Sequence, residues 1–155
     1  MNEQQLVIIS LGDARYAIDV QQIREIVKPK SITPIPHTPS FVEGLMNLRG
    51  QIVTVINLAE RLAALNKEIF AANEDKRLPQ ERIVVINHGG ELIGLRVQTV
   101  EHVMSVKSSS IELPAQNNEE ADIVSGVIQI NNALVMLLNT SLLLQPFSGG
   151  GEAHE

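Results

Sequence analysis

Residues 6–27, LVIISLGDARYAIDVQQIREIV, align without a gap with residues 83–104, IVVINHGGELIGLRVQTVEHVM, 77 positions later. Gly12 falls on Gly89 and Gln21 on Gln98. Apolar residues meet apolar residues at Leu6/Ile83, Val7/Val84, Ile8/Val85, Ile9/Ile86, Ile18/Leu95, Val20/Val97, Ile23/Val100, Ile26/Val103 and Val27/Met104.

A second pair of blocks repeats in the same order. Residues 44–62, GLMNLRGQIVTVINLAERL, align without a gap with residues 126–144, GVIQINNALVMLLNTSLLL, 82 positions later. Two pairs of blocks in one order indicate a structural unit built twice. Residues on which the copies agree are expected to be scaffold, and residues on which they differ are candidates for a specific task.

The size of the chain indicates how the two copies are organised. It has 155 residues, so each copy is near the lower limit for an independent core, and we expect the copies to share one. We predict a single domain over residues 5–147, with copy one at about 6–66 and copy two at about 82–146. The polar segment 67–81 is the expected connector, and the Gly-rich segment 148–155 is an expected disordered tail.

Short apolar runs separated by turn residues predict an all-β barrel or sandwich. A short helix is expected at 58–65, and a second after Asp19, with Ile23, Ile26 and Val27 on one face. The four prolines between 29 and 39 exclude a helix there and predict an extended, edge-like segment. The strands are expected at residues 6–11, 14–18, 44–48, 51–56, 83–86, 92–97, 124–130 and 134–138.

Composition and charge exclude several classes of function. The net charge of −6 argues against nucleic-acid binding, and the absence of cysteine excludes a disulfide framework. No apolar run reaches the roughly 20 residues of a membrane span, and no signal peptide is present, which fits a cytoplasmic protein. The four histidines lack metal-ligand spacing, and no catalytic motif is found. We therefore expect no enzyme activity, no metal and no cofactor.

The copies differ most sharply at the second hairpin turn, where Arg49-Gly50 of copy one aligns with Asn131-Asn132 of copy two. Positive φ at Gly50 satisfies the turn, so Arg49 is not required by it. Arg49 is either a solvated surface residue or a guanidinium held ready for contact. Glu25, which falls on His102, is a candidate partner for Arg49.

An apolar set surrounds Glu25 and consists of Val20, Ile23 and Ile26. Such residues usually belong to a core. If this segment lies at the seam between the copies, part of the set lines an apolar groove, which is a feature typical of protein-docking surfaces.

These residues resemble the CheW family of chemotaxis coupling proteins, and the resemblance covers about residues 5–147. Its clearest part is Asn47-Leu48-Arg49-Gly50, preceded by Pro36, Pro39, Phe41 and Gly44 and followed by Ile52-Val53 and Leu58. Further similar residues are Leu11-Gly12-Asp13, Tyr16, Ile18-Asp19, Ile23, Glu25-Ile26, Ile83-Val84-Val85, Gly94, Val97, Gly126 and Leu137-Leu138-Asn139.

The resemblance implies two intertwined five-stranded SH3-like β-barrels with a few short helices. It implies a non-enzymatic adaptor between the cytoplasmic tips of chemoreceptors and the regulatory domain of a CheA-type histidine kinase, located at membrane-associated receptor arrays without inserting into the membrane. The receptor-binding groove would consist of Val20, Ile23, Glu25, Ile26 and Arg49. Turn and structural roles would fall to Gly12, Gly44, Asn47, Gly50, Gly94 and Gly126.

The chain departs from the family pattern at a few positions. Thr54 stands where the family commonly has proline, Asn57 where it has aspartate, and Asn131-Asn132 where it has Asp-Gly. The departures leave open a coupling protein of a non-chemotaxis chemosensory system. A detached module of a CheA-like or CheV-like protein and a small ligand-binding barrel also stay open as interpretations.

Overall fold

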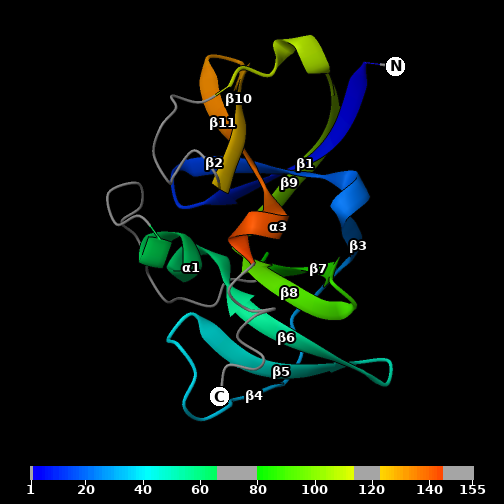
Figure 1. The fold of residues 1–155 in the computed structure, drawn as a ribbon, viewed down its shortest axis with the longest axis vertical. Helices are drawn as coiled ribbons and strands as arrows, with labels where there is room; N and C mark the ends of the chain where they lie inside the picture. The colour runs from blue at the N-terminus through cyan, green and yellow to red at the C-terminus, as the bar shows by residue number, and fades with distance from the viewer. Residues whose placement is uncertain (1, 66–79, 114–122, 145–155) are drawn as a thin grey trace.

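The computed structural model describes residues 2–65, 80–113 and 123–144. Strands dominate and lie in two sheets, one above the other in Figure 1, with the helices α1 (Leu58–Leu65) and α3 (Thr140–Leu143) near their junction. The strands are β1 Glu3–Leu11, β2 Ala14–Asp19, β3 Ile23–Val27, β4 Ile32–Thr33, β5 Val42–Leu48, β6 Gln51–Asn57, β7 Arg82–His88, β8 Glu91–Val97, β9 Thr99–Lys107, β10 Val124–Ile130 and β11 Ala133–Leu138. The helices are η1 Val20–Gln22, α1 Leu58–Leu65, η2 Ser108–Ser110 and α3 Thr140–Leu143.

The two sheets exchange hairpins between the copies. Sheet A has the order β10-β11-β2-β1-β9, and sheet B has the order β3-β7-β8-β6-β5-β4. Sheet A thus combines the first hairpin of copy one with the later strands of copy two, and sheet B combines the first hairpin of copy two with the later strands of copy one. This confirms the expected all-β, intertwined fold, to which β4 adds a sixth strand in sheet B.

The core explains why the opening strands of both copies are apolar at successive positions. On β1, Leu6 and Ile8 face a cluster inside sheet A, whereas Val7 and Ile9 face a central cluster between the sheets. On β7, residues 83 and 85 face a cluster inside sheet B, and residues 84 and 86 face the central cluster. Alternate side chains point to opposite faces, so a strand buried on both faces is apolar throughout.

In each sheet, one segment of the chain runs from one edge strand to the opposite edge. In sheet B, the chain leaves edge strand β3 and forms β4, which pairs with β5 at the opposite edge. In sheet A, the chain leaves β9, and Glu112 forms a bridge with Val127 of β10. Both crossings depend on a glycine, because a Cβ on Gly44 would overlap the Thr33 carbonyl and a Cβ on Gly126 would overlap the Ile111 side chain.

The helix expected after Asp19 is wrong, because the chain forms only the three-residue η1 there and continues as β3. The cause is a β-bulge: Ile23 pairs with Ile86 and Glu25 with Val85, so Arg24 is an extra residue. The bulge lengthens the apolar spacing from two to three and so imitates a helix. An equivalent bulge in β9, between the partners of Ile8 and Ile9, explains why the sequence pattern does not predict that strand.

The other expected elements lie close to their predicted places. Helix α1 covers residues 58–65 as predicted, and β4 is the expected edge segment among the prolines. Asn57 Oδ1 accepts a hydrogen bond from the Glu60 amide at 3.0 Å, and Asn139 Oδ1 accepts one from the Leu142 amide at 3.1 Å. Both asparagines therefore cap the helix that follows. The tail and nearly all of the connector lie outside the described residues.

Candidate protein-docking site

The apolar residues predicted for a groove lie around edge strand β3. Val20, Ile23 and Ile26 are each partly buried and pack against the central cluster. They are neither sealed in the core nor fully exposed, so each presents part of its surface to solvent. β3 pairs only with β7, which leaves its other edge open among the described strands.

An ion pair joins this strand to the β5–β6 hairpin. The Arg49 guanidinium donates from Nη2 to Glu25 Oε2, as the comparison of the copies suggested. The Arg49 side chain is 66% exposed and the Glu25 side chain 26% exposed. The structure therefore brings Arg49 together with Glu25, on the strand that also carries Ile23 and Ile26, and the Arg49 side chain is mostly exposed.

The backbone at Arg49 is unusual. The two-residue loop places Arg49 at φ 52° and Gly50 at φ 87°, and the equivalent Asn131 and Asn132 have φ 51° and 68°. Asparagine tolerates this left-handed region well, whereas arginine seldom adopts it. The backbone conformation of this turn is therefore unfavourable for Arg49. Asn47 supports the loop, since its Oδ1 accepts from the Gly50 amide at 2.9 Å.

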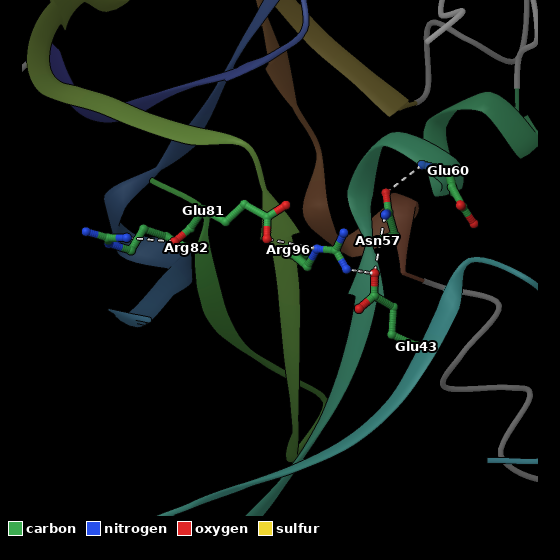
Figure 2. A network of polar contacts seen from close by, with 6 residues as sticks. All are labelled: Glu43, Asn57, Glu60, Glu81, Arg82 and Arg96. Carbon is green, nitrogen blue, oxygen red and sulfur yellow. Dashed lines mark hydrogen bonds and ion pairs between the residues drawn. The ribbon is translucent and has the colours of Figure 1, made fainter. Parts of the chain in front are cut away.

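A second polar group, buried in sheet B, was missed from the sequence (Figure 2). Arg96 on β8 donates from Nη1 to Glu43 on β5, and its Nε lies 3.5 Å from Glu81 Oε1. The side chains of Arg96, Glu43 and Glu81 are 5%, 14% and 4% exposed. Asn57 donates to Glu43 at 3.3 Å. We call Glu43, Glu81 and Arg96 the buried charge cluster.

The signal for this cluster was present in the repeat. Arg96 of copy two aligns with Asp19 of copy one, which has the opposite charge. Glu43 of copy one aligns with Ser125 of copy two, which has no charge. Both Glu43 and Ser125 are extra residues of equivalent β-bulges. Charge differences between copies, and not only differences at the turn, mark positions with a specific role.

Two further polar side chains are buried in the central region. Tyr16 is 1% exposed, its hydroxyl has no hydrogen-bond partner among the described residues, and burial raises the pKa of its phenol. Arg61 on α1 donates from Nε to the Leu143 carbonyl at 3.1 Å and lies 4.8 Å over the Phe41 ring. Burial lowers the pKa of Arg61. Arg61 therefore ties α1 to α3.

The remaining predicted structural residues lie at turns and close contacts. The Gly12 amide donates to Gln98 Oε1 at 2.7 Å, which joins the first hairpin of copy one to the end of β8. A Cβ on Gly94 would meet the Ile83 side chain at 2.5 Å. Within residues 2–65, 80–113 and 123–144, no group of three or more acidic, histidine or cysteine side chains could hold a metal. No helix in the same ranges is long and apolar enough to cross a membrane.

Comparisons with known proteins agree with this architecture. A model of the CheW-like domain matches residues 5–147. The chain is 30% identical over 137 residues to the chemotaxis protein CheW of Treponema pallidum, covering 87% of this chain and 78% of that protein. It is 29% identical over 147 residues to the chemotaxis protein CheW of Helicobacter pylori, covering 93% and 84%. A crystal structure of the scaffolding protein TtCheW from Thermoanaerobacter tengcongensis matches with a TM-score of 0.79 and 30% identity, covering 91% of this chain and 87% of that one.

Proposed function

From the premise that this chain belongs to the CheW-like family and is a non-enzymatic chemotaxis scaffold, we propose that it couples chemoreceptor tips to the regulatory domain of a CheA-type histidine kinase. The mechanism is positional: one rigid body holds receptor and kinase in a fixed relative geometry. A conformational change in the receptor then biases the kinase between two states, because the receptor states differ in the free energy with which they interact with each kinase state.

We place the receptor contact on the face formed by Val20, Ile23, Ile26 and the Glu25–Arg49 pair. The observation that carries this assignment is the position of Arg49. A left-handed arginine is unfavourable for folding, and copy two has asparagine at the same place. An exposed ion pair contributes only about 0.2–1 kcal/mol, so it offsets part of the strain and gives the fold no net reason to keep arginine. A contact with a partner gives Arg49 a reason to be retained.

Charge reversal tests this assignment. Arg49→Glu places two carboxylates side by side on the proposed contact face, and it is expected to weaken co-purification with a receptor-tip fragment by about tenfold. The double variant Glu25→Arg/Arg49→Glu restores the ion pair in reverse. If the pair only supports the fold, the double variant recovers full binding. If Arg49 contacts the receptor, binding remains weak although the pair is restored.

A matched control uses a second exposed ion pair, Arg15–Glu101, in which Arg15 Nε lies 3.3 Å from Glu101 and the side chains are 46% and 25% exposed. Arg15→Glu makes the same change in net charge on β2, away from β3. We expect it to bind receptor as the wild type does. Equal losses for Arg15→Glu and Arg49→Glu would mean that net charge, and not this face, controls binding.

The kinase contact and the cellular location follow from the same proposal. Co-purification with the regulatory domain of a CheA-type kinase is expected to survive Arg49→Glu, because kinase and receptor bind different surfaces of a bridging protein. The protein is expected to be cytoplasmic and to concentrate at receptor arrays. A fluorescent fusion that stays diffuse in cells with intact arrays would contradict the location, and loss of kinase binding in Arg49→Glu would contradict the separation of the two sites.

A further inference from the structure

The two exchanged hairpins are equivalent in their backbone pairing. β1–β2 and β7–β8 occupy equivalent places in the two sheets with the same register, since Val53 pairs with Leu92 in sheet B and Val135 with Arg15 in sheet A. Copy one gives its hairpin to copy two and receives one in return. By the same geometry, two copy ones from different chains could exchange hairpins and form a symmetric body.

The apolar residues of the opening strands do little to prevent this alternative pairing. Residues 6–9 of β1 and residues 83–86 of β7 are all branched aliphatics, and they fill equivalent places in the cores. Cores tolerate such substitutions when size and pattern are kept. The preference for pairing copy one with copy two must therefore come from other side chains.

Charges at the buried end of the hairpin supply the difference. In sheet B, Arg96 of the incoming hairpin lies against Glu43. The equivalent residue of the other hairpin is Asp19. If the copy ones of two chains exchanged hairpins, Asp19 of each chain would stand in place of Arg96, next to Glu43 of the other. Two carboxylates in such a poorly hydrated position repel each other and lack the cation that offsets their desolvation.

We propose that the buried charge cluster of Glu43, Glu81 and Arg96 directs each copy one to the copy two of its own chain and blocks exchange between the copy ones of two chains. Copy two self-pairing keeps the Glu81–Arg96 contact, which lies within its own hairpin, but finds Ser125 in place of Glu43. The selectivity therefore resides mainly in copy one, in the repulsion between Asp19 and Glu43.

Asp19→Arg tests the proposal in the full-length chain. The variant makes copy one complementary to itself, since the introduced guanidinium of one chain would meet Glu43 of another. After refolding from urea at high protein concentration, the dimer fraction measured by size exclusion with light scattering should rise about tenfold over wild type. Asp19→Asn is the control: it can still accept a hydrogen bond from the Gln21 amide, as Asp19 does at 2.8 Å, but supplies no cation. It removes the repulsion from Glu43 without adding an attraction, so its dimer fraction should lie between those of wild type and Asp19→Arg.

Two further variants exclude simpler explanations. Adding Glu43→Ser to Asp19→Arg removes the new partner and should lower the dimer fraction well below that of Asp19→Arg alone. If Asp19→Arg does not refold, Glu43→Lys probes the same pairing from β5, because the introduced ammonium attracts Asp19 of another chain and repels Arg96 of its own. Glu43→Lys should then give the dimer.

Nuclear magnetic resonance identifies the exchanged strands. In the monomer Val55 pairs with Gly94, whereas in a copy-one dimer Val55 would contact Ala17, which is equivalent to Gly94. A dimer with Val55–Ala17 contacts supports the proposal. The proposal would be overturned if Asp19→Arg and Glu43→Lys both formed no more dimer than the wild type. Equal dimer fractions in Asp19→Arg and Asp19→Asn would also overturn it.

Discussion

Replacing Arg49 by asparagine should stabilise the fold while weakening receptor binding. Copy two already has asparagine at the equivalent position, with nearly the same backbone angle: φ is 51° at Asn131 and 52° at Arg49. The loop therefore needs no rearrangement to accept the change. A gain in stability with a loss of binding separates a residue kept for function from one kept for the fold.

The expected change in the free energy of unfolding is the sum of two opposing contributions. A left-handed backbone is unfavourable by roughly 1 kcal/mol for a residue such as arginine, and asparagine removes most of this strain. Loss of the Glu25 ion pair opposes this gain. Because the Arg49 side chain is 66% exposed, the pair is worth only about 0.3 kcal/mol. Arg49→Asn should therefore raise the free energy of unfolding by about 0.5 kcal/mol, or the melting temperature by roughly 1–2 °C.

Urea unfolding followed by far-ultraviolet circular dichroism measures this change, since the chain has no tryptophan for fluorescence. Glu25→Gln is the matched variant, because it removes the ion pair and leaves the strain. It should lower the free energy of unfolding by about 0.3 kcal/mol. The gap between the two variants reports the backbone strain. A loss of more than about 1 kcal/mol in Arg49→Asn would refute the reasoning, because Arg49 would then be retained for stability.

Other substitutions test the remaining parts of the structure. Tyr16→Phe should be neutral or stabilising near pH 7, because the hydroxyl has no partner among the described residues, and it should flatten the alkaline loss of stability. Burial raises the pKa of Tyr16 above its ordinary 10.0, so its contribution is fully present below pH 10 and is lost as pH rises through the folded-state pKa; equal alkaline losses of stability in Tyr16→Phe and wild type would contradict this. Gly44→Ala should lower stability by about 2 kcal/mol or more, since its Cβ would overlap the Thr33 carbonyl, whereas Gly50→Ala, with open space around it, should cost about 1 kcal/mol; equal thermal unfolding curves would argue against the close crossing of β4. Ile23→Asp should abolish receptor pull-down with only a modest drop in melting temperature, because Ile23 is partly exposed, and outright unfolding would assign it to the core.

The repeated sequence predicted most of the fold because each opening strand is buried on both faces. The runs at 6–9 and 83–86 indicate such strands directly, and the glycine and asparagine residues between the runs mark the turns. Helix α1 was predictable because Asn57 caps it and apolar residues follow at helical spacing. Local patterns of this kind need no knowledge of distant contacts.

Features that depend on distant contacts could not be predicted in the same way. The bulges at Arg24 and Glu101 lie in the edge strands β3 and β9, and the extra residue disrupts the alternation from which strands are recognised. The pairing of Glu25 with Arg49 was suggested only by comparing the copies. The contact between Glu43 and Arg96 bridges strands from different copies, so it required knowledge of the hairpin exchange.

Chemical-shift mapping of isoleucine and valine methyl groups tests the central claim most directly. The claim is that a partner docks on the face around β3 and the β5–β6 turn. On titration with a receptor-tip fragment, Val20, Ile23 and Ile26 should shift first and most, while Val103, equivalent to Ile26 and 55% exposed on β9, should stay unchanged. Larger shifts at Val103 than at Ile26, or shifts confined to strands away from β3, would contradict the account.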